Sequence, residues 1–167
     1  MRLAQASISE NGTIHGALGN QNNKELNFGK IPNNFDFIIR ANNPYMRKNI
    51  ATIAISGVNN KRIGYSQLCR NNLWKKARKY LSIGGIKEDC ACDCSSFVSV
   101  VVNLAYRSIN GKWLPNYNID INACTTRNLV EKLINTGQFV SFPYKKNNLS
   151  EGDIIVKVGK HTGIIVE

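Results

Sequence analysis

The sequence predicts an α+β fold in which helices come first and a short antiparallel sheet closes the chain. Apolar residues recur at helical spacing over residues 93–109. Residues 139–142, 154–158 and 162–166 are rich in aromatic and β-branched side chains, which is typical of strands. Gly159-Lys160 joins the last two stretches and favours a hairpin. With 167 residues, the chain suits one compact unit.

The first half of the chain is predicted to contain a strand and three helices. Residues 2–9 fit a short helix, and residues 35–40 fit a strand. Asn43, followed by proline, is typical of a helix N-cap, and this helix should end at Gly57. Ser66 is expected to cap a further helix with a basic outer face.

The second half begins with the most apolar helix of the chain. It should start near Asp93 and end at Gly111. Residues 112–124 fit an irregular connection. Thr125 or Thr126 is expected to cap one more helix before the closing strands.

Composition limits the partners and the compartment. The chain has 22 Lys+Arg against 11 Asp+Glu, a net charge of +11, which favours polyanions such as nucleic acid or a teichoic acid-bearing wall. The basic residues are scattered, so a solvated surface is the alternative interpretation. No stretch approaches the ~20 apolar residues of a membrane span. The N-terminus lacks the apolar core of a signal peptide, so we expect synthesis in a cytoplasm. Five cysteines cannot form a full disulfide framework, and free thiols are expected.

Cys94 and His161 are the candidates for chemistry. Cys94 falls in the first turn of the apolar helix, where free N–H groups and the helix dipole favour a thiolate. His161 begins the last strand, beside a glycine turn. Such a pair suits thiol acyl transfer, with the backbone N–H groups of Cys94 and Ser95 facing the oxyanion. Taken singly, each residue is more often structural.

Three segments resemble the NlpC/P60 cysteine peptidases in order and in local sequence. They are Asp-Cys-Ser-Ser-Phe-Val at 93–98, Leu-Ser-Glu-Gly-Asp-Ile-Ile at 149–155, and His-Thr-Gly-Ile-Ile-Val at 161–166. Tyr65 resembles the family tyrosine that contacts the nucleophile. Residues 1–60 more loosely resemble the N-terminal part of phage-encoded wall lysins.

The resemblance implies a papain-like fold with the nucleophile helix packed on the sheet. It implies a catalytic domain over 61–167, for which truncation at the C-terminus is one interpretation, with residues 1–60 packed against it. The implied activity is hydrolysis of an amide bond in the peptide part of peptidoglycan, without metal or cofactor, by Cys94 and His161. A phage endolysin would be made in the host cytoplasm without a signal peptide and act on the cell wall. Peptidoglycan is the expected partner, with anionic wall polymer as a further one; specific nucleic acid and a membrane span are not expected.

Two alternatives stay open. A CHAP-like N-acetylmuramoyl-L-alanine amidase uses the same order of Cys and His. A non-catalytic basic module would bind anionic wall polymer through its charge and would not need the Cys/His pair.

The chain departs from the family pattern in two places. Family members orient the histidine with a third polar residue about a dozen positions later, but this chain ends at Glu167. Three alternatives stay open: the third residue is lost by truncation, replaced by Glu167, or supplied from elsewhere, for instance by His15 or an asparagine-rich loop. Glu167 lies ~20 Å along an extended strand from His161, too far for a hydrogen bond. Cys90 and Cys92 precede Cys94 at a spacing that does not suit zinc, and they are expected to be free thiols.

Four residues are candidates for contacting substrate. They are Asn20, Gln21, Asp93 and Trp113. Each has a simpler interpretation as a turn, cap or core residue, because aromatic side chains in particular dominate core burial.

Overall fold

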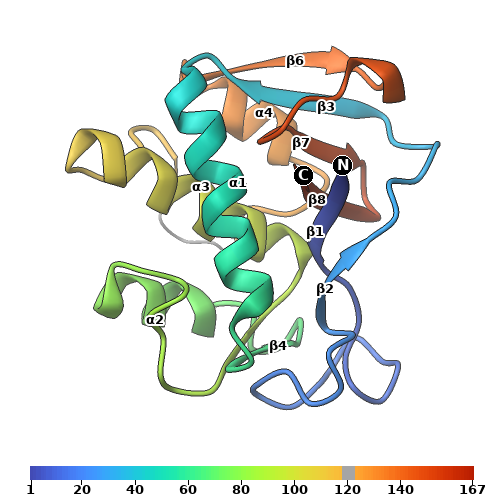
Figure 1. Ribbon diagram of the computed structural model, residues 1–167, viewed down its shortest axis with the longest axis vertical. Coiled ribbons are helices and arrows are strands. Elements are labelled where there is room, and N and C mark those ends of the chain that lie inside the picture. Colours follow the sequence, from blue (N-terminus) through green and yellow to red (C-terminus); the bar gives the residue numbers. More distant parts are fainter. Residues whose placement is uncertain (118–122) are drawn as a thin grey trace.

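The computed structural model of the protein describes residues 1–117 and 123–167. It has the predicted α+β fold, with helices packed on a six-stranded sheet (Figure 1). The strand order is β2-β1-β8-β7-β3-β6, and each paired neighbour is antiparallel. The strands are β1 (Arg2–Ala6), β2 (Leu26–Gly29), β3 (Phe37–Ala41), β6 (Phe139–Pro143), β7 (Ile154–Lys157) and β8 (His161–Val166). The four predicted strands and the closing hairpin are confirmed.

The prediction of a helix over residues 2–9 is wrong, because these residues form β1. This strand lies between β2 and β8, and in Figure 1 the first strand of the chain runs beside the last one. Its side chains alternate, with Leu3 buried on one face of the sheet and Ala4 and Ala6 on the other. Pairing with two distant strands outweighs the local sequence, as often happens for strands. The sheet is therefore built from both ends of the chain and is not confined to its end.

A second, two-stranded sheet was not predicted. It pairs β4 (Ile63–Tyr65) with β5 (Cys90–Cys92) in parallel. Tyr65 lies opposite Cys92 in this sheet, which carries the chain directly into the helix that begins at Cys94.

The two long helices are close to their predicted bounds. In α1 (Pro44–Asn59), the Asn43 side chain accepts hydrogen bonds from the N–H groups of Tyr45 and Met46. The helix α3 (Cys94–Asn110) ends at Gly111, whose φ of 69° is the left-handed conformation that favours glycine.

The two shorter helices differ at their starts. The helix α2 (Asn72–Tyr80) begins later than predicted, because Ser66 instead accepts a hydrogen bond from the Cys69 N–H in a preceding turn. The helix α4 (Leu129–Ile134) is present, but neither threonine caps it. The Asn128 side chain instead accepts a hydrogen bond from the Thr125 N–H (2.8 Å). The short 3-10 helix η2 (Lys146–Asn148) precedes β7. Part of the predicted irregular connection, residues 118–122, lies outside the described residues.

Apolar side chains fill both faces of the large sheet. The larger cluster lies between the sheet and the helices α1 and α3, where residues such as Ile164 and Phe97 are fully buried. The smaller cluster covers the opposite face and consists of Leu3, Phe35, Ile38, Leu149, Ile155 and Ile165. None of the helices in the described part of the chain has the length and apolar character that crossing a bilayer requires.

The segment at 149–155 contacts both β3 and α1. Asp153 is fully buried, and both its carboxylate oxygens accept hydrogen bonds from the Arg40 guanidinium of β3, each at 2.7 Å. Gly152 has a φ of +83°, and a side chain there would lie 2.2 Å from the Arg47 carbonyl oxygen. Glycine is therefore required by both the backbone angle and the space. This segment has a structural role in the turn that leads into β7.

Candidate active site

Cys94 is the first residue of α3, and a capping box holds the start of that helix. Asp93 Oδ1 accepts a hydrogen bond from the Ser96 N–H (2.8 Å), and Ser96 Oγ accepts one from the Asp93 N–H (2.8 Å). Both backbone donors are thereby satisfied at a helix end that is buried. The predicted position of Cys94 at a helix N-terminus is confirmed.

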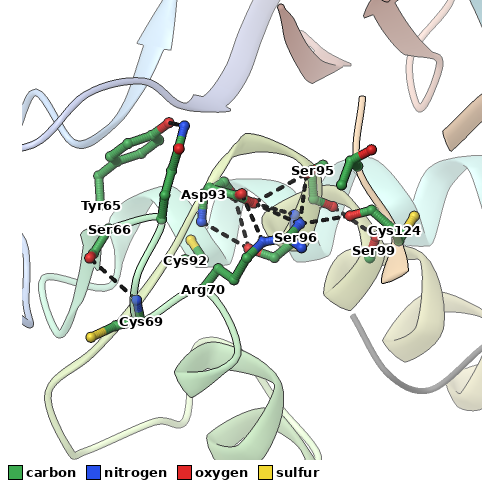
Figure 2. A network of polar contacts seen from close by, with 12 residues as sticks. Tyr65, Ser66, Cys69, Arg70, Cys92, Asp93, Ser95, Ser96, Ser99 and Cys124 are labelled. Carbon is green, nitrogen blue, oxygen red and sulfur yellow. Dashed lines mark hydrogen bonds and ion pairs between the residues drawn. The ribbon is translucent and has the colours of Figure 1, made fainter. Parts of the chain in front are cut away.

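Arg70 anchors this capping box from the segment before α2 (Figure 2). Its Nε donates to Asp93 Oδ2 at 2.8 Å, and its Nη2 donates to Ser95 Oγ at 2.9 Å and to the Cys124 carbonyl oxygen at 2.6 Å. Charge-assisted hydrogen bonds of this kind are strong when they are shielded from water. The Asp93 carboxylate is directed at Arg70 and at the helix N-terminus, and Ser95 belongs to the same network.

A second set of polar side chains continues the network along α3. The hydroxyl groups of Ser99 and Tyr117 are 2.8 Å apart, and the Tyr117 hydroxyl is 2.9 Å from the Cys124 sulfur. All three residues are buried. Tyr117 thus links Cys124 to Ser99 on the helix that starts at Cys94.

The sulfur of Cys94 faces backbone N–H groups but is buried. The backbone N–H groups of Thr162 and, within the helix, of Ser95 and Cys94 itself lower the pKa of the thiol. Burial raises the pKa most, the Asp93 carboxylate raises it further, and the result is a pKa of about 12. The prediction that the helix N-terminus favours the thiolate is therefore wrong for the free protein. The N–H groups are present, but loss of water and a neighbouring negative charge outweigh them.

His161 is half-buried at the start of β8 and is held by Gln5. The His161 Nε2 and the Gln5 Oε1 are 2.7 Å apart, and the Phe35 ring centroid lies 6.4 Å from that of the imidazole. Burial lowers the pKa of His161 below its usual 6.5. The imidazole is therefore neutral at pH 7.

Cys94 and His161 meet the same end of β8 from different sides. The N–H of Thr162, the residue after His161, lowers the pKa of the Cys94 thiol. Side chains alternate along a strand, so His161 shares a face with Ile165, which belongs to the smaller cluster. The helix α3 packs on the other face. Among the described contacts, no hydrogen bond joins the thiol to the imidazole.

Tyr65 lies beside the start of α3. It is the last residue of β4, and its hydroxyl accepts a hydrogen bond from Gln67 Nε2 at 3.4 Å. Burial raises its pKa to about 12, with smaller contributions from Cys94 and Asp93. Tyr65 is the register partner of Cys92, two residues before Cys94, and its contact with the nucleophile stays a prediction.

The remaining candidates for substrate contact lie elsewhere. Asn20 is buried and its N–H donates to the Lys61 carbonyl, at the end of β4 away from Tyr65. The Gln21 side chain is exposed and donates to the carbonyl of Leu18. Trp113 packs on Trp74, with ring centroids 5.0 Å apart. The Arg107 guanidinium lies over the Trp113 ring. Arg107 is in the last turn of α3, about 20 Å along that helix from Cys94.

The other histidine, the remaining cysteines and Glu167 are also placed by the structure. His15 is exposed, and its backbone bridges to Ser66. Glu167 accepts a hydrogen bond from Arg2 through its main-chain oxygen. The prediction that Cys90 and Cys92 are free thiols is confirmed, and the structure shows that both are buried. In residues 1–117 and 123–167, no three His, Cys, Asp or Glu side chains are grouped as metal ligands would be.

Sequence reasoning missed Arg70 and Gln5. Arg70 stands in a stretch rich in basic residues and looks like one more solvated charge. Gln5 lies in the segment predicted as a helix. Neither residue has a local signal for its role, because each acts through a partner that is distant in the sequence.

The fold and the site define a class of protein. It is an α+β domain in which a cysteine begins a helix, a histidine begins a strand of the sheet, and the helix packs on that strand. The chain belongs to the endolysin-like domain family, whose model matches residues 3–167. The match runs from β1, near the start of the chain, to β8, near its end. It associates the chain with lysis of the bacterial cell wall. No curated protein and no solved structure matches the chain.

Proposed function

We propose that this chain is a cell-wall hydrolase that cleaves an amide bond in the peptide part of peptidoglycan, with Cys94 as nucleophile and His161 as general base. The observation that carries the proposal is the place of Cys94 at the N-terminus of α3, packed on β8, where the N–H of Thr162, next to His161, lowers the pKa of the thiol. Membership of the endolysin-like family supports the substrate class. The three segments that resemble the NlpC/P60 peptidases support the thiol chemistry.

The pKa shifts favour a neutral pair at rest. Burial raises the pKa of Cys94 to about 12 and lowers the pKa of His161, so neither group is charged at pH 7. His161 must therefore take the thiol proton as the sulfur attacks the amide carbonyl carbon. The C–N bond then breaks, the imidazolium gives its proton to the leaving amine, and water hydrolyses the thioester. The N–H groups that face the sulfur are donors available to the developing oxyanion.

This mechanism requires a movement at the start of β8. His161 is hydrogen-bonded to Gln5 on the face of the smaller cluster, whereas α3 lies on the other face. The thiol of Cys94 and the Nδ1 of His161 have to come within hydrogen-bond reach at the end of the strand when substrate binds, while Nε2 keeps its contact with Gln5.

The direct test is the clearing of purified Gram-positive walls by Cys94→Ala. We expect a loss of at least about a thousandfold, because removal of a covalent nucleophile abolishes its pathway. The matched control is Cys69→Ala, since Cys69 is free and only half-buried, and it should clear walls like the unchanged protein. Clearing by Cys94→Ala at the unchanged rate, with the fold intact, removes Cys94 from the mechanism.

A second candidate is a non-catalytic module that binds anionic wall polymer. The buried, protonated state of Cys94 favours it, as does the net charge of +11. Such a module would bind walls without clearing them, and binding would weaken steeply with salt. A CHAP-like amidase would clear walls but cut the bond between muramic acid and L-alanine, which the masses of the products distinguish.

A further inference from the structure

We infer that Gln5, on the N-terminal strand, is the positioning residue that orients His161 for its role as a base. The inference rests on the proposed function. It assigns to a residue of this chain the orienting role that a third polar residue has in the family that the sequence resembles. Glu167 does not take this place, because its described contact is the bond from its main-chain oxygen to Arg2.

The strand order explains how Gln5 reaches the histidine. β1 and β7 are the two neighbours of β8 in the sheet. The described register pairs Ala4 with Ile164, so Gln5 continues along the side of β8 toward His161. Gln5 also shares a face with Leu3, which belongs to the smaller cluster, as Ile165 does. The two polar side chains therefore stand on one face of the sheet.

A chain of hydrogen bonds fixes which atom donates to which. The Asn27 Nδ2 contacts the Lys24 carbonyl, which can only accept, so the Asn27 Oδ1 is left as an acceptor. The Gln5 Nε2 donates to this oxygen at 3.0 Å. The Gln5 Oε1 therefore faces His161 as an acceptor, 2.7 Å from Nε2. The proton of the neutral imidazole accordingly lies on Nε2, and Nδ1 is the basic nitrogen.

The surroundings of the ring make Gln5 its principal polar contact. Phe35 lies on the same face, and Lys157 is the register partner of His161 on β7. The Lys157 ammonium is paired with the Asp36 carboxylate at 2.7 Å. The described ring contacts include no carboxylate. Gln5 thus orients the imidazole without adding a charge that would keep it protonated, which suits a base that is neutral at rest.

The first arm of the test is NMR of the histidine rings and needs no activity. The chain has two histidines, so His15→Asn leaves the ring of His161 alone in the spectrum. We expect the ring proton on Nε2 in the otherwise unchanged protein. Gln5→Glu keeps the acceptor and adds a negative charge, and it should raise the pKa of His161 by about one. Gln5→Leu removes the acceptor and should speed exchange of the Nε2 proton with water.

The second arm measures wall clearing against pH. Gln5→Leu should lower the maximal rate by about 10- to 100-fold with little change in the substrate concentration at half-maximal rate. Gln5→Glu should restore part of that rate and move the acid limb of the profile to higher pH, because a histidine of higher pKa is neutral only at higher pH. The matched control, Gln138→Leu, lies beside the edge strand β6 and should leave rate and profile unchanged.

The two arms separate the two claims. A proton on Nδ1, or a His161 titration unchanged in Gln5→Glu, overturns the role of Gln5. An unchanged pH profile in Gln5→Glu and an unchanged rate in Gln5→Leu also overturn it. If the protein does not clear walls, or if Cys94→Ala clears them fully, the proposed function fails, and the NMR arm still decides whether Gln5 orients the ring.

Discussion

At the scale of single residues, the thiol of Cys94 shows two opposing effects. Backbone N–H groups at the start of α3 and at Thr162 stabilise a negative sulfur. Burial and the neighbouring Asp93 destabilise it, and they prevail, since the pKa is about 12. The position of a cysteine in a helix therefore does not settle its reactivity. Access of water and substrate decides it.

This balance predicts the order in which the cysteines react with iodoacetamide. Cys69 is half-buried and the other four cysteines are buried, so Cys69 should be alkylated first at neutral pH. For a thiol with a pKa of about 12, the fraction present as thiolate rises about tenfold with each pH unit below that pKa. The rate at which iodoacetamide labels Cys94 should therefore keep rising up to about pH 10. Peptide mapping by mass spectrometry measures both.

The control for this labelling is the denatured protein, in which all five thiols should react alike. Labelling of Cys94 ahead of Cys69 in the folded protein at neutral pH would contradict a buried, protonated thiol. It would instead indicate an activated cysteine in the free enzyme.

At the scale of elements, the start of α3 depends on Asp93 more than on any property of Cys94. The Asp93 carboxylate caps the helix and also pairs with Arg70, and the two side chains are only 11% and 12% exposed. A charge pair so shielded from water is costly to break, because one charge stays buried without its counter-charge. The same carboxylate thus fixes the place of the thiol and raises its pKa.

Asp93→Ala should lower the free energy of unfolding by at least about 3 kcal/mol, since it removes both the cap and the ion pair. Asp93→Asn keeps an oxygen for the cap and should cost less. Urea unfolding measures both variants. Asp89→Asn is the matched control, because the Arg62–Asp89 pair is about half exposed and should change stability by less than about 1 kcal/mol. Equal losses for Asp93→Ala and Asp89→Asn would show that the capping network does not hold the helix.

At the scale of the whole molecule, the sequence predicts the later elements better than the first ones. Helices α1 and α3 carry their own N-caps in Asn43 and Asp93, and the closing hairpin carries its turn, so short windows suffice. β1 has no such signal. Its short run Arg2–Ala6 becomes a strand only because β2 and β8 lie on either side of it. The register with β8 is not visible in a local pattern.

The candidate site likewise contains some residues whose places the sequence predicts and others whose roles it does not. The places of Cys94 and His161 at the starts of α3 and β8 follow from local motifs. The roles of Arg70 and Gln5 depend on contacts over long sequence separations, to Asp93 and to His161. The pKa of Cys94 depends on how completely α3 and β8 close over the sulfur. No periodicity in the sequence reports that closure.

The measurement that tests the central claim most directly is mass spectrometry of purified peptidoglycan incubated with the protein and with Cys94→Ala. We predict fragments whose masses show one water added across an amide bond of the peptide part, and we predict their absence with Cys94→Ala. The same fragments from both proteins, or products cut only between sugars, would contradict a thiol hydrolase centred on Cys94.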